Sequence, residues 1–296
     1  MNEIINNNLK KLKEKKIPDP ELELRILLSY SSNNNKNIFL NNLDEVDINF
    51  DKLNLFVEKR LNDQPISKII NKKSFWKSDF YVNFSVLDPR PETELIIEEV
   101  LNFYKNKYKK LRILDIGTGS GCLSVSLAKE FPNSNITAID ISDSALKVAK
   151  KNITLNNVEN QINLRHCELK DINDIYDIIV SNPPYLSEDD YKKVQPEIKK
   201  YEPKIALVSQ DGLSFYKMFS KNIENIMNEN SHFIFEIGYN QLKPCKAIFR
   251  KSNLKLKKIS KDIQKIDRTL TFIKIWVEFF FECMYKINIR YINLII

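Results

Sequence analysis

Apolar side chains recur at helical spacing in the first quarter of the chain. The period of three or four residues is found in three segments, residues 5–12, 22–28 and 53–61. Pro18 and Pro20 separate the first two segments, because proline interrupts a helix interior. The pattern predicts a small all-α domain over residues 1–72 whose apolar faces pack against one another.

A different pattern, rich in aromatic and β-branched residues, follows over residues 75–87. Such side chains favour extended structure, and we expect a β-hairpin or an extended linker over residues 73–90. The next segment contains Pro91, which suits the first turn of a helix, and two glutamates that favour the positive end of that helix. A rigid helix start explains most of this segment but gives Arg90 no role.

From residue 111 onward, predicted strands alternate with predicted helices. The strands are expected at 112–116, 135–140, 162–164, 177–181 and 232–237, and the helices at 122–130, 144–152 and 212–227. This alternation predicts an α/β fold, a mostly parallel Rossmann-like sheet with helices on both faces, over residues 91–275. In such sheets ligands bind beyond the carboxyl ends of the strands, so motifs at those ends are candidate functional residues.

Three of the five glycines in this chain of 296 residues fall in one turn, which reads Gly117-Thr118-Gly119-Ser120-Gly121. The turn follows the first predicted strand of the sheet. Glycine permits positive φ and lets a ligand approach bare backbone. Asp140 ends the next strand, 23 residues after Gly117, where a carboxylate can accept both hydroxyl protons of a ribose. Together these features predict a nucleotide-like cofactor.

The cofactor suggested by this turn is either NAD or S-adenosylmethionine. A dinucleotide fingerprint has the spacing G-x-G-x-x-G, with a helix N-terminus facing the pyrophosphate. Here Gly121 comes one residue earlier, and position 122 is cysteine. Asp115, just before the turn, suits a cationic ligand better than a pyrophosphate. We therefore favour S-adenosylmethionine.

The motif Asn182-Pro183-Pro184-Tyr185 follows the predicted strand 177–181, on the cofactor side of the sheet. Proline has no backbone N–H, so the loop presents acceptors with few competing donors. The side-chain oxygen of Asn182 and the carbonyl of Pro183 can together accept both hydrogens of a substrate NH₂ group. Methyl transfer develops positive charge on that nitrogen, which such acceptors stabilise. The ring of Tyr185 offers a face for a flat amide or base.

The net charge bears on which partner the protein binds, and the cysteine content bears on the redox compartment in which it occurs. The net charge of +7 suits RNA or a ribosome-associated partner, although a lysine-rich surface explains it equally simply, and we favour the latter. The cysteines and histidines are scattered, at Cys122, Cys167, Cys245, Cys283, His166 and His232. This spacing predicts no disulfide framework and no metal site, and reduced thiols in a cytoplasmic protein. The N-terminus has no long apolar run, so we expect no signal peptide.

The last segment, residues 276–296, is mostly aromatic and aliphatic. Glu282 and Lys286 near its middle oppose membrane insertion, so we expect no transmembrane segment. Four charged residues recur every four positions, at Glu278, Glu282, Lys286 and Arg290. This spacing predicts an amphipathic helix docked on the body of the protein. Contact with a membrane surface or a partner is the alternative.

The chain resembles the peptide chain release factor N5-glutamine methyltransferases, the HemK-type family of class I S-adenosylmethionine-dependent enzymes. The matching motifs are Pro89-Arg90-Pro91-Glu92-Thr93-Glu94, Asp115 to Gly121, Asp140-Ile141-Ser142, Ser181 to Tyr185, Glu202-Pro203, Asp211-Gly212-Leu213, Glu236-Ile237-Gly238 and Asp267-Arg268. They run in family order over nearly the whole chain to about residue 275. The Asn-Pro-Pro-Tyr loop is shared with other amino-methylating enzymes, whereas the Arg-Pro-Glu-Thr-Glu segment is more specific.

This resemblance implies methylation of N5 of the glutamine in the Gly-Gly-Gln loop of release factors. It also implies a helical N-terminal domain that engages the release factor, a β-hairpin linker and a C-terminal methyltransferase domain. The residues implied to bind the cofactor are Gly117, Thr118, Gly119, Ser120, Gly121, Asp140, Leu169 and Asn182, with Asp140 on the ribose and Leu169, beside Glu168, on the adenine. Asn182 to Tyr185 are implied to hold the glutamine amide. We expect a monomer.

Two rival functions remain open from the sequence. Exocyclic amines of adenine in DNA or guanine in RNA present the same NH₂ group, but a DNA enzyme normally has a base-reading domain and flips its base. A helical domain of about 72 residues with mild positive charge is a poor candidate for sequence-specific reading of nucleic acid. A release-factor-binding scaffold without turnover is the second rival, and the presence of Asn182 and Asp140 argues against it.

Overall fold

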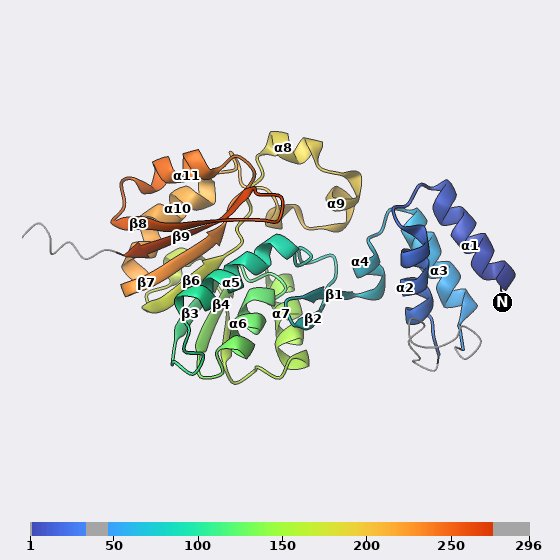
Figure 1. The fold of residues 1–296 in the computed structure, drawn as a ribbon, viewed down its shortest axis with the longest axis horizontal. Helices are drawn as coiled ribbons and strands as arrows, with labels where there is room; N and C mark the ends of the chain where they lie inside the picture. The colour runs from blue at the N-terminus through green and yellow to red at the C-terminus, as the bar shows by residue number, and fades with distance from the viewer. Residues whose placement is uncertain (1, 34–46, 275–296) are drawn as a thin grey trace, which may run out of the picture.

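The computed structural model describes residues 2–33 and 47–274. Its N-terminal part is helical, with α1 (Asn2–Glu14), α2 (Pro20–Tyr30), α3 (Phe50–Leu61) and α4 (Ile66–Ile70). These helices bury a small core that includes Leu12, Leu27 and Leu53, each fully buried. The chain continues into an antiparallel hairpin, β1 (Lys72–Phe75) and β2 (Ser78–Tyr81), which connects this helical part to the α/β part (Figure 1).

The α/β part is built on one sheet, in which the described residues form seven strands. Their order is β5-β4-β3-β6-β7-β9-β8. The parallel strands are β3 (Arg112–Ile116), β4 (Asn135–Asp140), β5 (Ile162–His166), β6 (Tyr176–Ser181) and β7 (Met227–Glu236), and the antiparallel ones are β8 (Leu254–Lys261) and β9 (Asp267–Lys274). The predicted α/β fold with a mostly parallel sheet is confirmed.

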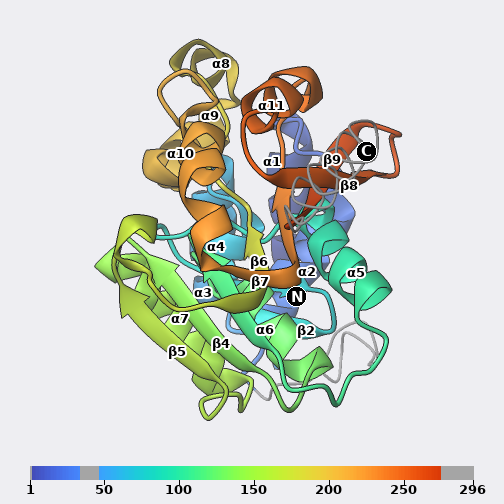
Figure 2. The same ribbon diagram turned by 90° about the vertical axis from the view of Figure 1, so that its left-hand side faces the viewer.

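Helices cover both faces of this sheet (Figure 2). One face packs against α5 (Glu94–Phe103), α6 (Cys122–Glu130) and α7 (Asp143–Leu155), and the other against α10 (Ser214–Asn222) and α11 (Leu242–Phe249). Alternate strand residues point to opposite faces. Ile113 belongs to the first core and Leu114 to the second. Strands buried on both sides explain why these segments read as continuous apolar runs.

The predicted helix over residues 212–227 is too long. Helix α10 ends at Asn222, a 3₁₀ turn covers Ile223–Ile226, and Met227 already begins β7. Ile223 and Ile226 are buried three residues apart, so the apolar spacing of a helix continues through the tighter turn. The apolar pattern therefore could not show where the helix ends.

Several elements were not predicted from the apolar pattern. These are α4, α8 (Glu188–Lys193), α9 (Pro196–Tyr201), α11, β8 and β9. Strand β8 lies at the sheet edge, carries four lysines, and has two register irregularities, which break the alternation that marks a strand. The predicted helix over 276–296 lies outside the described residues. Within the described ranges, no helix combines the length and apolar content needed to cross a membrane.

Helix α4 is attached to the loop that precedes α5 through the fully buried ammonium of Lys68. Its Nζ lies 2.6 Å from Oδ1 of Asp88 and donates to the carbonyls of Asn83, at 2.7 Å, and Val86, at 2.8 Å. A buried charge is tolerated only with such partners. The helical part and the loop after the hairpin are therefore fixed to each other.

Candidate active site

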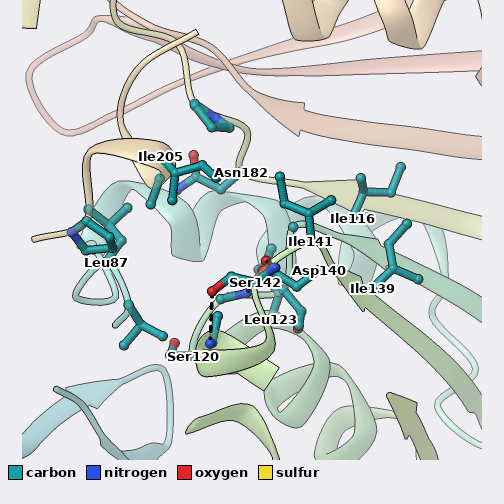
Figure 3. A pocket seen from close by; sticks show the side chains of 18 of the residues that line it. Leu87, Ile116, Ser120, Leu123, Ile139, Asp140, Ile141, Ser142, Asn182 and Ile205 are labelled. Carbon is teal, nitrogen blue, oxygen red and sulfur yellow. Dashed lines mark hydrogen bonds between the residues drawn. The ribbon is translucent and has the colours of Figure 1, made fainter. Parts of the chain in front are cut away.

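A cavity of about 320 Å³ lies beyond the carboxyl ends of β3, β4 and β6. Its lining includes Gly117, Asp140 and Asn182, which come from the ends of these three neighbouring strands. Figure 3 shows Asp140 and Asn182 together with apolar side chains around this space. The volume is that of a small-molecule site. The structure thus brings the glycine turn and the Asn-Pro-Pro-Tyr loop to one cavity.

The glycine turn presents bare backbone to the cavity. Gly117 has φ +72° and Gly119 has φ +54°, both in the left-handed region, and both line the cavity. A Cβ built on Gly117 would meet no atom within 4 Å, so the missing side chain faces open space. Thr118 and Ser120 line the same wall. This is the geometry expected where a ligand approaches the main chain closely.

Gly121 has a different environment from the other glycines of the turn. It does not belong to the cavity lining, and its backbone has φ +79° at the start of α6. A Cβ there would lie 3.3 Å from Cβ of Ala149 in α7. Glycine at 121 therefore allows α6 and α7 to pack closely, and the cofactor contact expected from the sequence stays a prediction.

Asp140 stabilises the glycine turn as well as lining the cavity. Its Oδ2 accepts from the backbone N–H of Gly119 at 2.9 Å, and its Oδ1 accepts from the N–H of Ser142 at 2.9 Å. A carboxylate oxygen can accept two hydrogen bonds, so each retains one free lone pair. The ribose contact expected for Asp140 stays a prediction that this arrangement permits.

Asp115 lies beneath the turn and is buried. Its Oδ2 accepts from the hydroxyls of Thr118 and Ser124, each at 2.7 Å, while its Oδ1 has no hydrogen-bond partner in the described residues. Burial raises the pKa of this carboxyl to about 6, against the lowering effect of the two hydroxyls. Asp115 is not part of the cavity lining, so any effect on a bound cation acts through the turn.

Another part of the cavity lining is formed by the segment after β5. Cys167, Glu168 and Leu169 line the cavity there, and Leu169 is buried at 4% exposure. These are the residues at which the family resemblance places the adenine. An apolar side chain at this wall fits a flat aromatic group, but the contact itself stays a prediction.

Two of the four residues of the Asn-Pro-Pro-Tyr loop line the cavity. These are Asn182 and Pro184, whereas Pro183 and Tyr185 are outside the lining. Nδ2 of Asn182 donates to Oγ1 of Thr93 at 2.8 Å, which leaves Oδ1 as the acceptor of this amide. The hydroxyl of Tyr185 donates to Glu236 at 3.2 Å. The proposed substrate contacts of Pro183 and Tyr185 therefore remain predictions.

Gln241, which the sequence did not suggest, fixes the position of this loop. Its Nε2 donates to the carbonyls of Tyr185, at 2.9 Å, and Gly212, at 3.1 Å. Its Oε1 accepts from the N–H of Gly238 at 2.8 Å and from the hydroxyl of Tyr216 at 3.0 Å. One amide thus connects three loops, and no local pattern in the sequence marks it.

The two glycines outside the cofactor turn leave room for this arrangement. A Cβ on Gly238 would lie 2.7 Å from Oε1 of Gln241 and 2.9 Å from Cδ2 of Tyr185. A Cβ on Gly212, where φ is +75°, would lie 3.0 Å from the carbonyl oxygen of Tyr185. Glycine is required at both positions because the Asn-Pro-Pro-Tyr loop and the side chain of Gln241 occupy the space that a side chain would need.

Arg90 joins two walls of the cavity. It lines the cavity, and its Nη2 donates to Oε2 of Glu202 at 2.6 Å. Glu202 is buried at 7% exposure, and Pro203 beside it also lines the cavity. The ion pair therefore connects the segment before α5 to the segment after α9. This gives Arg90 the role that a helix start alone did not explain.

Comparison with known proteins agrees with this geometry. Residues 86–203 match the family model described as the methyltransferase small domain. The chain is 35% identical over 277 residues to a release factor glutamine methyltransferase of Fusobacterium nucleatum, which covers 90% of this chain and 77% of that protein. It is 34% identical over 298 residues to a bifunctional methyltransferase of Rickettsia bellii, covering 90% of this chain. The chain spans about half of that relative, 53% of its length.

A solved structure supports the fold alone. The methyltransferase from Pyrococcus furiosus is 19% identical, with a TM-score of 0.50 over 73% of this chain and 96% of that one. The relatives found by sequence show the family as well as the fold, because they are more than 30% identical to this chain over most of both chains. The resemblance seen in the motifs is confirmed, and the chain belongs to the release factor glutamine methyltransferase family.

Proposed function

We propose that this protein transfers a methyl group from S-adenosylmethionine to the side-chain amide nitrogen, N5, of the glutamine in the Gly-Gly-Gln motif of peptide chain release factors. The observation that supports it most is the position of Asn182. Its amide lies on the same cavity as the bare backbone of Gly117 and Gly119, and its Nδ2 is already engaged by Thr93. The remaining oxygen is an acceptor suited to a primary amide.

The cavity fits the proposed cofactor. The open space beside Gly117 admits a ligand against the main chain, and free lone pairs on Asp140 suit hydroxyl donors. Gly117 to Ser120, Asp140 and Leu169 would hold the cofactor. When bound, S-adenosylmethionine supplies an electrophilic methyl group on a sulfonium.

The chain's own contribution to transfer is the placement of acceptors for the substrate nitrogen. Oδ1 of Asn182 and the carbonyl of Pro183 would accept the two amide hydrogens and hold the nitrogen with its lone-pair face toward the methyl. Positive charge develops on this nitrogen during alkylation, so fixed acceptors stabilise the transition state more than the ground state. The proton becomes acidic once the nitrogen is alkylated, so a dedicated general base is not required.

The substrate class, the monomeric state and the cytoplasmic location belong to the same proposal. The ion pair of Lys68 with Asp88 attaches the helical part to the cavity-lining loop, so a partner held by the helices would be held near the site.

The test is transfer of labelled methyl groups to purified release factors. The proposal expects label on the intact Gly-Gly-Gln loop and none on a substrate carrying Gln→Ala at that position. DNA and tRNA are offered in parallel. Label in nucleic acid without label in release factor would overturn the assignment in favour of an exocyclic-amine methyltransferase. Cofactor binding without label in any substrate would favour an inactive scaffold.

A further inference from the structure

The amide of Asn182 is the first group of a hydrogen-bonded chain that leads away from the cavity. Asn182 donates to Thr93 at 2.8 Å, and Thr93 donates to Oε2 of Glu236 at 2.6 Å. The other oxygen of Glu236 accepts from the hydroxyl of Tyr185 at 3.2 Å. Thr93 is 2% exposed and Glu236 is 1% exposed. The chain is therefore shielded from solvent over most of its length.

The direction of these hydrogen bonds is fixed by the carboxylate. An ionised carboxylate only accepts, so the hydrogen of the Thr93 hydroxyl must point toward Glu236. The lone pairs of Thr93 then face Asn182 and can receive only an N–H. The amide of Asn182 is thereby held with its nitrogen toward Thr93, which leaves its oxygen as the acceptor that a ligand in the cavity can meet.

We propose that Thr93 and Glu236 are positioning residues that set the orientation of the Asn182 amide, so that the substrate NH₂ meets an acceptor and not a second donor. This role rests on the proposed function, since it concerns the recognition of a primary amide. Glu236 does not line the cavity, and its hydrogen-bonded connection to Asn182 runs through Thr93. The proposal gives a physical reason for a threonine in the Arg-Pro-Glu-Thr-Glu segment and a glutamate at the end of β7.

Protonation of Glu236 would remove this control. A carboxylic acid can donate to Thr93, whose hydrogen is then free to point at Asn182, and the amide can turn to present its NH₂ to the cavity. The groups that act on Glu236 are Thr93, Tyr185 and Arg268, which favour its ionised form, and Glu92, which opposes it. Burial outweighs them and raises the pKa of this carboxyl to about 7. Turnover is accordingly expected to fall as the pH decreases below neutrality.

The first test compares two substitutions of Thr93. Thr93→Val keeps the shape but removes the hydroxyl, and we expect turnover to fall by about 10 to 100-fold, less than for loss of the acceptor itself. Cofactor affinity, measured by titration calorimetry, is expected to stay within a few-fold. Thr93→Ser retains a hydroxyl and is expected to restore turnover to within a few-fold of the original. Equal turnover of Thr93→Val and the unaltered protein, or equal loss in both variants, would overturn the proposal.

The second test replaces Glu236 by glutamine, which does not titrate. The original protein is expected to lose turnover on the acid side with an apparent pKa near 7, and Glu236→Gln is expected to have lower turnover that no longer changes between about pH 6 and pH 8. An acid limb that remains unchanged in Glu236→Gln would contradict the proposed role.

A third measurement does not depend on turnover and separates this inference from the proposed function. The side-chain ¹⁵N–¹H₂ signals of Asn182, assigned by their loss in Asn182→Ala, are followed by NMR from pH 6 to pH 8. They are expected to titrate in the original protein and to become independent of pH in Glu236→Gln. Signals that titrate alike in both proteins would overturn the inference. If release factors are not methylated while the signals behave as expected, only the substrate assignment fails.

Discussion

Two buried carboxylates, Asp115 and Glu236, lie near the carboxyl ends of β3 and β7. Asp115 accepts hydroxyl hydrogen bonds from Thr118 and Ser124, and Glu236 accepts them from Thr93 and Tyr185. Burial raises the pKa of both, to about 6 and about 7. The partners of Asp115 are 3 and 9 residues away in the chain, whereas those of Glu236 are 143 and 51 residues away.

This difference in sequence separation distinguishes the part of the site that would bind the cofactor from the part that would carry out methyl transfer. Asp115 stabilises a turn formed by its own neighbours, so the cofactor side is a local unit of strand, turn and helix. Glu236 connects the segment before α5 with the loop after β6, so the transfer side exists only when distant segments have assembled. We therefore expect substitutions on the first side to alter cofactor affinity and those on the second side to alter turnover.

The largest expected effect is on the transfer side, from Asn182→Ala. Turnover is expected to fall by about 10² to 10³-fold, because one fixed acceptor for the substrate nitrogen is lost. Cofactor affinity by titration calorimetry should stay within a few-fold. Asn160→Ala, at an exposed asparagine, is the matched control and should change neither quantity. Near-normal turnover of Asn182→Ala would refute the role given to this residue.

A pair of glycine substitutions tests the separation directly. In Gly238→Ala the new methyl group would lie 2.7 Å from Oε1 of Gln241 and 2.9 Å from Cδ2 of Tyr185, so these side chains, which hold the Asn-Pro-Pro-Tyr loop, must move. We expect roughly a 10-fold loss of turnover with cofactor affinity unchanged, since misplacement of a fixed acceptor weakens transition-state binding.

In Gly117→Ala the methyl group meets no protein atom but enters the cavity, and alanine at φ +72° is strained by about 1 kcal/mol. Here the expected change is weaker cofactor binding. Titration calorimetry and single-turnover rates for both variants decide the comparison. If Gly238→Ala weakened cofactor binding as much as Gly117→Ala did, the two sides of the cavity would not be separate.

The same contrast between local and distant partners explains which features could be predicted from the sequence. Gly117 to Gly121 and Asp140 form one strand-turn-helix-strand unit, and the sequence placed them correctly at a strand end. Gln241 could not be predicted, because its importance comes from contacts with carbonyls 56 and 29 residues away. Thr93 and Glu236 stand within motifs of the family, but the role proposed for them depends on contacts that only the fold creates, Thr93 with Asn182 and Glu236 with Thr93.

Glycines within one correctly placed motif can have different neighbours in the fold. Gly121 was expected at the cofactor, yet it faces Ala149 in the neighbouring helix α7. Gly117 and Gly121 both have positive φ, but a Cβ at position 121 would meet helix α7, whereas a Cβ at position 117 would meet open space. A one-dimensional pattern shows that a side chain is not tolerated and does not show what takes its place.

On the cofactor side, Asp140→Ala is expected to weaken cofactor binding by about 10-fold. The carboxylate supplies free lone pairs to the cavity and also accepts from the N–H of Gly119, so its loss removes a ligand contact and loosens the turn. Asp140→Asn keeps one acceptor oxygen, so its cofactor affinity should lie between that of Asp140→Ala and that of the original protein. Unchanged affinity of Asp140→Ala in titration calorimetry would mean that the ribose is held elsewhere.

The smallest expected effect is on stability, and it distinguishes the two carboxylates by pH. Each has a folded-state pKa above its ordinary value, 3.8 for Asp115 and 4.5 for Glu236. Its stabilising contribution is therefore complete below the ordinary value and is lost as the pH rises through about 6 for Asp115 and about 7 for Glu236. Between those limits the loss is on the order of 1 kcal/mol per pH unit and group.

Urea unfolding at a series of pH values measures these contributions as differences from the original protein. Asp115→Asn should gain stability relative to the original between about pH 4 and pH 6 and remain parallel to it above that range. Glu236→Gln should continue to gain up to about pH 7. Asp115 and Glu236 share no hydrogen-bond partner in the described residues. If the two carboxylates act independently, the stability change in the double variant Asp115→Asn/Glu236→Gln should equal the sum of the changes in the two single variants. Strong non-additivity would show that the two carboxylates interact and that the two sides of the cavity are not independent.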